Sequence, residues 1–435
     1  MIYKLLMINK LSPIDLCKKL FPINRSLTGK GNRETLSILK SVCPKLVMKS
    51  FKCKKKVFDW KIPKEWVVKD AYLLTPDKKK ICSFKENNLH LVGYSRSVNK
   101  NINLKELQKN LHSLPDQPNA IPYITSYYEK NWGFCISDKQ RKKLKKGIYK
   151  VVVDTKFIDG KLDYAEIIHK GNLKKEVFFS TYICHPSMAN DEISGMVVAI
   201  FLANYLRKKN TRYSYRFLFI PETIGSIAYL SKNLNNLKNN MLAGYVLSCV
   251  GDERCFSFLP SKYGNTPSDK IAIEIFKKIK TKKKVFDWNE RGSDERQYCA
   301  PFVNLPVSSI MRSKYAEYPE YHTSLDKIGT VVTNKGLTET INFYKNVIKK
   351  FENTYFPVST KICEPFMTKY NLYSTLKNKK DKNLNVLSNS KIMNFLTWCD
   401  GTNSLEDISK KINLKKNLSF ELFKLLKKKK LIKVS

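Results

Sequence analysis

The sequence predicts an α/β protein whose main body is a mixed sheet flanked by helices. Near-continuous apolar runs of strand length alternate with helical patterns over the second half of the chain, short strands without helices precede them, and three short helices close it. At 435 residues the chain is too long for a single hydrophobic core. We expect a discontinuous main domain at 1–54 and 160–356, an inserted antiparallel β domain at 55–159, and a small C-terminal domain at 357–435.

The strand–helix alternation of the main domain begins near residue 160. Apolar runs without polar alternation are typical of strands covered on both faces, so we expect a largely parallel or mixed sheet between helices. The N-terminal segment adds two helices and a strand to this domain. The expected strands are 46–51, 164–169, 177–184, 215–220, 243–250 and 305–311, and the expected helices are 12–21, 33–42, 196–207, 226–234, 268–280 and 336–351.

The predicted insert at 55–159 has a different pattern. Its short apolar and aromatic runs are bounded by Pro, Asn, Asp and Lys, which predicts antiparallel strands. Residues 111–135 are crowded with Pro and aromatic residues. This stretch is either a binding loop or a long loop held by aromatic packing, and we favour the second interpretation.

The composition limits the class of protein. The net charge is +42, from 80 Lys and Arg against 38 Asp and Glu, and 69 of the basic residues are lysines. Nucleic-acid readers rely on arginine, so we interpret the lysine excess as a solvated surface that still favours anionic partners, such as polysaccharide or a membrane surface. Eleven cysteines without a C-x-x-C pair disfavour a disulfide framework and zinc-finger modules.

No targeting or membrane segment is evident in the sequence. The first 21 residues lack an apolar core of signal-peptide length and a small-residue cleavage site. No apolar run approaches the roughly 18 residues of a membrane span. We therefore expect a soluble, cytoplasmic protein.

Polar residues follow the predicted strands at the points where these strands end. His185 and Asp191 follow one strand, Glu222 follows the next, Asp252 the one after, and His322 lies in the loop beyond the last. Ligands of open α/β sheets gather at the carboxyl ends of strands, so we expect these side chains to converge. Only five histidines occur in the chain, and two of them fall at this edge.

Two imidazoles with several carboxylates are a ligand set that zinc takes. A catalytic zinc site keeps one position open for water, and a carboxylate that does not ligate can accept a proton from that water. Taken alone, each side chain also has a structural explanation as a strand-end histidine, a helix cap or a partner in an ion pair. Their joint placement favours a metal site.

Six segments of the main domain carry a family resemblance: HPSMANDEISG, FIPETIGS, CVGDER, LPSKYGNT, RGSDERQY and EYPEYHTSLD. With LHSLPDQPNAIPYITSYY and WGFC in the insert, they resemble a group of bacterial aminopeptidase-like proteins related to the co-catalytic zinc aminopeptidases. The resemblance covers nearly the whole chain. It implies a phosphorylase/hydrolase-like α/β core, a β domain inserted near its start and a C-terminal winged helix. Members of the group are often associated with surface-polysaccharide biosynthesis.

The resemblance also implies roles for individual residues. His185, Asp191, Asp252 and His322 match metal-ligand positions, with Asp191 as a bridge if two zinc ions are bound. Glu222 matches the general base of the parent aminopeptidases. The resemblance implies a peptidase-like hydrolase with one or two zinc ions, although a shared fold does not by itself establish the reaction.

Two departures from the parent pattern concern the metal count. The parent family has two adjacent glutamates, one base and one ligand, whereas here Glu222 is followed by Thr223. Either Glu222 is a ligand and the base is lost or replaced, or Glu222 is the base and the second metal is weak or absent. In addition, Glu192 stands after the metal aspartate, where asparagine is usual. A single-zinc site or altered catalysis stays open.

Four further charged residues, Asp294, Glu295, Arg296 and Arg312, are predicted to line the same cleft. The acidic side chains would bind the free amino group of a substrate, and Arg312 would bind a carboxylate or an acidic sugar. The alternative is an ion-pair network that supports the loops.

The C-terminal segment shows a helix–helix–turn–helix–strand pattern, which is that of a winged helix and agrees with the family resemblance. Between residues 410 and 433, ten lysines against one glutamate suit phosphate contacts. The expected recognition helix, however, has no Arg, Asn or Gln between 418 and 430 to read base edges. We therefore place protein or intramolecular docking ahead of nucleic-acid binding.

Three functions remain. The first is a zinc-dependent aminopeptidase-type hydrolase that cleaves a peptide, amino-acyl or glycan-linked amide with metal-activated water, in surface-polysaccharide biosynthesis or modification. The second is a carbohydrate-binding or carbohydrate-modifying protein whose β insert contacts sugars. The third is a regulator in which a degenerate peptidase domain senses a ligand and the winged helix relays the signal to DNA. We also allow for a homo-oligomer.

Overall fold

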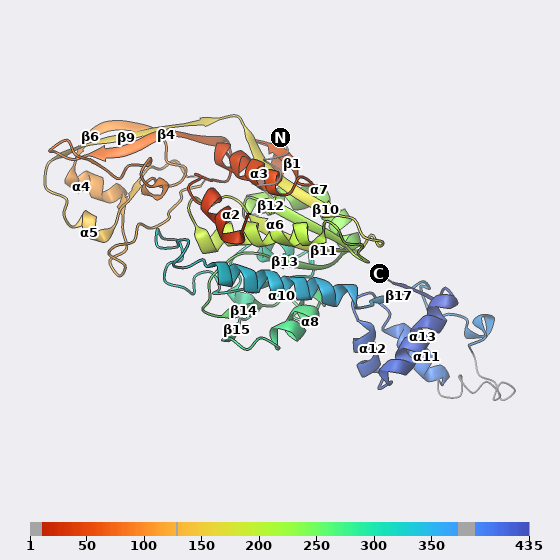
Figure 1. Ribbon diagram of the computed structural model, residues 1–435. Helices are drawn as coiled ribbons and strands as arrows, with labels where there is room; N and C mark the ends of the chain where they lie inside the picture. The colour runs from red at the N-terminus through yellow and green to blue at the C-terminus, as the bar shows by residue number, and fades with distance from the viewer. Residues whose placement is uncertain (1–10, 128, 373–387, 435) are drawn as a thin grey trace.

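The computed structural model describes residues 11–127, 129–372 and 388–434. Figure 1 shows a central layered body, with the insert strands β4, β6 and β9 extending from one end and helices α11, α12 and α13 at the opposite end. No helix among the described residues is long and apolar enough to cross a membrane.

An eight-stranded mixed sheet forms the centre of the body, as the predicted fold class requires. The four neighbouring pairs β11–β12, β11–β13, β13–β16 and β14–β15 are parallel, and the other three pairs are antiparallel. In spatial order the strands are β1 (Val47–Lys52), β10 (Lys161–His169), β12 (Ser214–Ile220), β11 (Glu176–Tyr182), β13 (Met241–Val246), β16 (Val307–Met311), β14 (Phe256–Leu259) and β15 (Lys283–Val285).

The sheet divides the apolar core into two parts, because its central strands bury side chains on both faces. Phe179 and Phe217 belong to the core on one face, and their neighbours Phe178 and Leu218 belong to the core on the other. The first core is shared with α2 (Pro13–Leu20), α3 (Lys30–Val42), α6 (Ser194–Leu206), α8 (Pro267–Phe276) and α10 (Asn334–Glu352), and the second with α7 (Ile224–Asn240) and α9 (Glu295–Tyr298).

Residues 65–158 supply a separate four-stranded antiparallel sheet, which lies within the range predicted for the insert. Its order is β5 (Lys80–Ile81), β4 (Glu65–Leu74), β9 (Ile148–Ile158) and β6 (Val98–Asn103). The shorter elements around it are β2 (Lys56–Val57), β3 (Trp60–Lys61), α4 (Leu104–Leu107), β7 (Leu111–His112), β8 (Phe134–Cys135) and α5 (Asp138–Arg141). Strand β9 is followed directly by β10, so the insert is tied to the central sheet.

The C-terminal domain has the predicted order of helices and a terminal strand. Helices α11 (Asn389–Thr397), α12 (Leu405–Lys411) and α13 (Lys416–Lys428) bury one apolar face each. A capping box between Ser404 and Asp407 starts α12, as the sequence predicts. The last strand, β18 (Ile432–Val434), pairs antiparallel with β17 (Pro357–Ser359), which follows α10.

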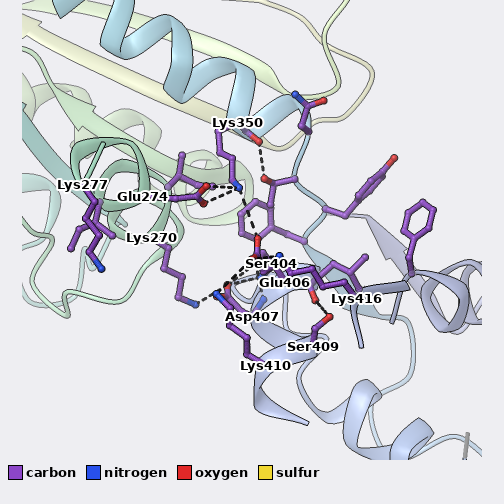
Figure 2. A pocket seen from close by; sticks show the side chains of 18 of the residues that line it. Lys270, Glu274, Lys277, Lys350, Ser404, Glu406, Asp407, Ser409, Lys410 and Lys416 are labelled. Atoms are coloured by element: carbon purple, nitrogen blue, oxygen red, sulfur yellow. Dashed lines mark hydrogen bonds and ion pairs between the residues drawn. The ribbon is translucent and has the colours of Figure 1, made fainter. Parts of the chain in front are cut away.

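Ion pairs join the C-terminal domain to the central body. Lys350 of α10 lies 2.8 Å from the carboxylate of Glu274 on α8 and 4.0 Å from that of Glu406 on α12. Lys270 of α8 lies 3.4 Å from Asp407 of α12. These residues line a cavity of about 740 Å³ at the junction. Figure 2 shows how they lie around it. The C-terminal domain and the central body thus meet through charged groups that surround this cavity.

Candidate metal centre

The candidate site is built where β11 meets α6. The buried strand ends at Tyr182, and the chain then passes through Cys184-His185-Pro186 into a fully buried helical turn at Ala189–Ile193. A side chain at Gly195 would place a Cβ 2.2 Å from the backbone oxygen of Leu247, so only glycine lets the start of α6 approach the end of β13 this closely. This close approach brings the turn to the carboxyl edge of the sheet.

Three predicted ligands, His185, Asp191 and His322, come together at this edge, each with a donor atom within 4.8 Å of the others. Nε2 of His322 lies 3.1 Å, and Nε2 of His185 4.0 Å, from Oδ2 of Asp191. Ligands of one tetrahedral zinc ion stand about 3.4 Å apart, given bonds of roughly 2.1 Å. Burial raises the pKa of Asp191, but the two imidazoles outweigh it and lower the pKa to about 2, so this carboxylate is ionised.

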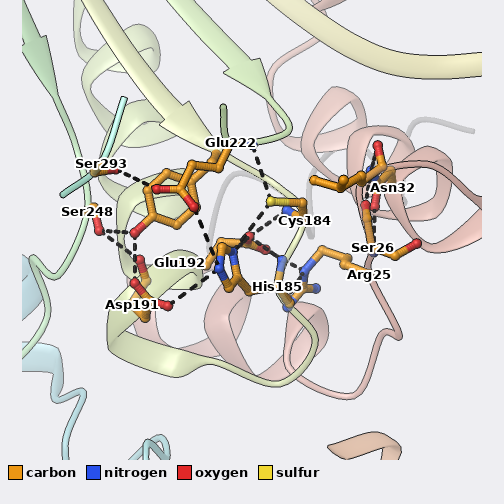
Figure 3. A network of polar contacts seen from close by, with 12 residues as sticks. Arg25, Ser26, Asn32, Cys184, His185, Asp191, Glu192, Glu222, Ser248 and Ser293 are labelled. Atoms are coloured by element: carbon orange, nitrogen blue, oxygen red, sulfur yellow. Dashed lines mark hydrogen bonds and ion pairs between the residues drawn. The ribbon is translucent and has the colours of Figure 1, made fainter. Parts of the chain in front are cut away.

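Glu222 stands beside this group at the end of β12. Its Oε2 lies 3.9 Å from Nε2 of His185, and its Oε1 accepts a hydrogen bond of 3.1 Å from the hydroxyl of Ser293. Burial, supported by nearby carboxylates and opposed by His185, raises the pKa of Glu222 to about 8. Glu222 can therefore hold a proton near neutral pH, and Figure 3 shows it facing the same space as His185.

A buried ion pair fixes the orientation of His185. Glu192 accepts hydrogen bonds from Nδ1 of His185 (3.0 Å) and from Nε of Arg25 (2.7 Å), and Arg25 also donates to the backbone oxygen of His185 (3.0 Å). The side chains of Arg25 and Glu192 are fully buried. A proton on Nδ1 leaves Nε2 as the metal-binding nitrogen. The sequence marked Glu192 only as a departure from the family pattern and did not indicate this role.

The second carboxylate oxygen of Asp191, Oδ1, faces the hydroxyl of Tyr182 and the thiol of Cys249. Tyr182 donates a hydrogen bond of 2.7 Å to Oδ1 of Asp191, and its hydroxyl also lies 2.5 Å from that of Ser248. Ser248 in turn donates to the backbone oxygen of Asp191 at 2.8 Å. Ser248 and Cys249, just past β13, therefore connect that strand end to Asp191, and Figure 3 shows Ser248 beside it.

The turn that carries Asp191 is held by a second carboxylate that sequence reasoning missed. Asp326 accepts hydrogen bonds from the backbone N–H groups of Asn190 (2.8 Å) and Asp191 (3.1 Å) and from the hydroxyl of Tyr318 (3.2 Å). Burial raises the pKa of Asp326 to about 7. The only signal for this role was its place in the segment EYPEYHTSLD, four residues after His322.

The insert reaches the site through its loop rich in proline and aromatic residues. The ring of Tyr123 lies 5.2 Å from that of His185 and meets the ring of His322 edge-on at 5.1 Å, centroid to centroid. The backbone N–H of Tyr123 donates to the backbone oxygen of His322 at 2.7 Å, and Ile121 and Ser324 are joined by two further hydrogen bonds. The aromatic packing that the sequence favoured for this loop is thus directed at the candidate metal ligands.

Asp252, by contrast, does not join the group. Its carboxylate accepts four hydrogen bonds of 2.9 to 3.0 Å, from the side chain of Asn190, the backbone N–H of Arg254, and the backbone N–H and hydroxyl of Ser313. These donors use its acceptor capacity to hold the neighbouring loops together. We therefore remove Asp252 from the predicted ligands.

The four predicted cleft residues have different positions. Asp294 accepts hydrogen bonds from the backbone N–H of Thr223 and the hydroxyl of Ser226, both at 2.8 Å, and Glu295 accepts from the backbone N–H groups of two preceding residues and from Tyr315. Both acids are buried, so they support the loops, as the alternative interpretation proposed.

The two predicted arginines, Arg296 and Arg312, also lie in different environments. Arg296 is exposed and donates a hydrogen bond of 2.7 Å to the hydroxyl of Thr223, next to Glu222. Arg312 is buried, pairs with Glu339 of α10 at 2.9 Å, and lies over the ring of Phe256. The prediction that Arg312 lines the cleft is therefore wrong, because its side chain is engaged by the helix layer.

Comparisons with known proteins agree with this architecture. A family model described as a domain of unknown function (DUF4910) matches residues 14–354, and a winged helix-turn-helix model matches residues 355–434. A Clostridium acetobutylicum protein, provisionally named a polysaccharide biosynthesis protein with an aminopeptidase-like domain, is 42% identical over 399 residues, which cover 91% of this chain and 90% of that protein.

Two solved structures extend the comparison. The crystal structure of a provisionally named peptidase from Clostridium acetobutylicum is 38% identical and has a TM-score of 0.78, over 99% of this chain and 97% of its own. The zinc aminopeptidase BSAP from Bacillus subtilis shares the fold, with a TM-score of 0.58 at 13% identity, over 78% of this chain and 94% of its own. The predicted family resemblance is thus confirmed, and the chain belongs to the DUF4910 family of aminopeptidase-like proteins that carry a C-terminal winged helix.

Proposed function

We propose that this protein is a hydrolase of the aminopeptidase type that holds one zinc ion through His185, Asp191 and His322 and uses Glu222 as its general base. The observation that carries the proposal is the convergence of these three donor groups, with Glu222 3.9 Å from His185. Two imidazoles and one carboxylate are a ligand set of catalytic zinc sites, which leave the remaining position open. The likeness to zinc aminopeptidases supports the choice of metal.

One ion, rather than two, is favoured by the surroundings of Asp191. A bridging carboxylate gives one oxygen to each ion, so a second ion at Oδ1 of Asp191 would need further ligands beside the hydrogen bond that Oδ1 accepts from Tyr182. The other groups on that side are the hydroxyl of Ser248 and the thiol of Cys249, 3.9 Å from Oδ1, and burial raises the pKa of this thiol well above its usual range, so it stays protonated. A hydroxyl is a poor replacement because zinc takes carboxylate, imidazole and thiolate ligands.

The side chains of the site have separate chemical tasks. Bound zinc would supply Lewis-acid activation of water and of a substrate carbonyl. Glu222 accepts the proton of the attacking water and delivers it to the leaving amine, a task for which a pKa raised toward neutrality is suited. Ser293 holds the second oxygen of Glu222, and Glu192 holds His185 in the required tautomer.

We propose a small amide as the substrate, either amino-acyl or glycan-linked. The ring of Tyr123 packs against both imidazoles, which favours a small group on that side. Asp294 and Glu295, expected to bind a free amino group, are engaged in the loops, so we do not require an N-terminal amine. The provisional name of the Clostridium acetobutylicum relative supports a role in polysaccharide biosynthesis.

The test combines metal analysis with hydrolysis assays. Protein purified without added metal is assayed for zinc and for release of amines from amino-acyl anilides, short peptides and N-acyl amino sugars. We expect about one zinc per chain, hydrolysis of at least one amide class, and a Glu222→Gln variant that keeps zinc while its rate falls roughly 10²–10⁴-fold.

The same assay separates the other functions. Bound zinc without hydrolysis of any amide, together with retention on immobilised glycans, would favour a carbohydrate-binding protein. Absence of zinc from freshly purified and zinc-soaked protein alike would contradict the proposal and favour the regulator. A Glu222→Gln variant that loses zinc would reassign Glu222 from base to ligand.

A further inference from the structure

A second cavity lies between the central body and the winged helix, away from the metal ligands. It has a volume of about 940 Å³. The central body contributes the end of α7 and the loop before α8, and the winged helix contributes the turn between α11 and α12 and the last strand, β18. A cavity of this size, enclosed by two domains, is in the range of small-molecule sites.

The lining of this cavity, called the interdomain groove below, is strongly basic. Seven lysines and two aspartates line it. Asp400 accepts hydrogen bonds from Thr402 and Asn403, and Asp407 caps α12, so both carboxylates already serve the winged helix. Among the residues that the structure describes, the ion pairs of the seven lysines are Lys270 with Asp407 and Lys410 with a glutamate outside the groove.

Each of the two domains contributes lysines to the cavity. Lys175 lies in the loop before β11, and Lys433 lies on β18 of the winged helix. Lys175 donates a hydrogen bond of 2.9 Å to the backbone oxygen of Asn239, and burial and repulsion between the ammonium groups of Lys175 and Lys433 lower its pKa. An anion between them would replace this repulsion with attraction.

Aromatic faces accompany the lysines. The side chains of Trp398 and Tyr263 are 37% and 62% exposed, and the ammonium of Lys411 lies 3.9 Å from the ring centroid of Trp398. Val358 pairs with Lys433 on one side and with Asp400, two residues after Trp398, on the other. The cavity therefore places a partly exposed aromatic ring beside lysines of the winged helix.

We propose that this groove binds a nucleoside diphosphate, with the phosphates held by Lys175 and Lys433 and the planar base packed on Trp398. Ammonium groups provide the charge for phosphate, and an exposed indole provides a stacking surface for any base. A nucleic-acid strand fits the observations less well, because the lysines face an interdomain cavity rather than the exposed surface of α13. The ligand would also link the two domains, since each contributes one of the two lysines.

The test is titration calorimetry on the full chain with ADP, UDP and inorganic pyrophosphate at physiological salt. We expect micromolar binding of at least one nucleotide, and pyrophosphate binding at least about tenfold more weakly because it lacks a base. Lys175→Gln and Lys433→Gln should each weaken nucleotide binding roughly tenfold, the loss expected for one charged hydrogen bond. Trp398→Leu should weaken the nucleotide but not pyrophosphate.

The matched control is Lys424→Gln, which removes one lysine from the exposed face of α13 outside the groove. This variant should bind nucleotides as the parent protein does. Thermal unfolding of each variant shows whether it is folded, and Trp398→Met replaces Trp398→Leu if the latter is not. The proposal is overturned if neither nucleotide binds, if pyrophosphate binds as tightly, if Lys424→Gln weakens nucleotide binding as much as Lys433→Gln, or if duplex DNA binds more tightly than nucleotides and Lys424→Gln abolishes it.

Discussion

The two oxygens of Asp191 have opposite surroundings. Oδ2 faces the imidazoles of His185 and His322, whereas Oδ1 accepts a hydrogen bond from Tyr182, whose hydroxyl also contacts Ser248. The Oδ2 side therefore offers nitrogen and oxygen donors to a cation, and the Oδ1 side faces protein hydroxyl groups and the thiol of Cys249. The number of metal ions that Asp191 can hold therefore depends on the groups beside each of its two oxygens, and not on this carboxylate alone.

The largest effect on zinc binding is expected when the charge of Asp191 is removed. Asp191→Asn should abolish stoichiometric zinc binding, because the amide removes the only anionic donor from the three-residue group. Zinc content after dialysis, measured by atomic emission, checks this outcome. Asp252→Asn is the matched control and should keep zinc while lowering the free energy of unfolding by about 1–3 kcal/mol through its disturbed hydrogen bonds. Equal zinc loss in both variants would contradict the assignment.

The ion pair behind His185 provides the next largest effect. Glu192→Gln removes the charge that pairs with Arg25 and weakens the hold on Nδ1 of His185. Zinc affinity should fall roughly 10–100-fold, as for other groups that orient a ligand. Stability should also fall, by about 3–5 kcal/mol, because Arg25 would stay buried without its partner.

Competition with a fluorescent chelator measures the affinity of this variant, and urea unfolding measures its stability. Glu65→Gln provides a control of the same chemistry, since Glu65 pairs with Arg33 away from the site. It should leave zinc affinity unchanged. Unchanged zinc affinity in Glu192→Gln would show that the ion pair serves the fold alone.

The pH dependence of stability tests the protonation of the buried carboxylates at the site. The pKa of Glu222 is raised to about 8 and that of Asp326 to about 7, so between their unfolded values near 4 and these folded values the native state binds more protons than the unfolded state. Stability of the metal-free protein should therefore fall as the pH rises from 5 to 8.

Calorimetric melting of chelator-treated protein at pH 5, 6, 7 and 8 measures this trend. Zinc should flatten it, because a cation stabilises the ionised carboxylates of the site. A melting temperature of the metal-free protein that rises over this range would contradict the account of the buried carboxylates.

The smallest effect on zinc affinity is expected when the hydroxyl group bonded to Oδ1 of Asp191 is removed. Tyr182→Phe removes one hydrogen bond to Oδ1 of Asp191 without changing the shape of the core. The affinity for the first zinc should change by no more than about tenfold, the worth of a single hydrogen bond. Titration of this variant with zinc should still end near one equivalent, because no ligand has been added. Complete loss of zinc would mean that Tyr182 belongs to the ligand group.

Much of the site followed from the positions of polar residues after apolar runs. His185, Asp191, Glu222 and His322 meet because the strands before the first three end at one sheet edge, which the sequence pattern can predict. For Asp252, the same reasoning predicted a metal ligand, but the structure does not place it with the others. It lies six residues beyond the end of β13, where the chain has already turned into a loop that uses its carboxylate for hydrogen bonds.

Other functional contacts could not be predicted because they depend on packing between distant segments. Tyr123 reaches the site from an insert that precedes His185 by about sixty residues, and no local pattern marks it. The pairing of Glu192 with Arg25 joins the site to a loop near the N-terminus. Arg312 shows the converse case, since it lies just past a central strand but its side chain is taken up by α10.

The central claim is a single zinc ion held by three residues. The most direct test is anomalous diffraction at the zinc edge from crystals of the full chain grown without chelator. We predict one strong peak, about 2.0–2.2 Å from donor atoms of His185, Asp191 and His322. Two peaks that share Asp191, or a peak that none of these three side chains contacts, would contradict it.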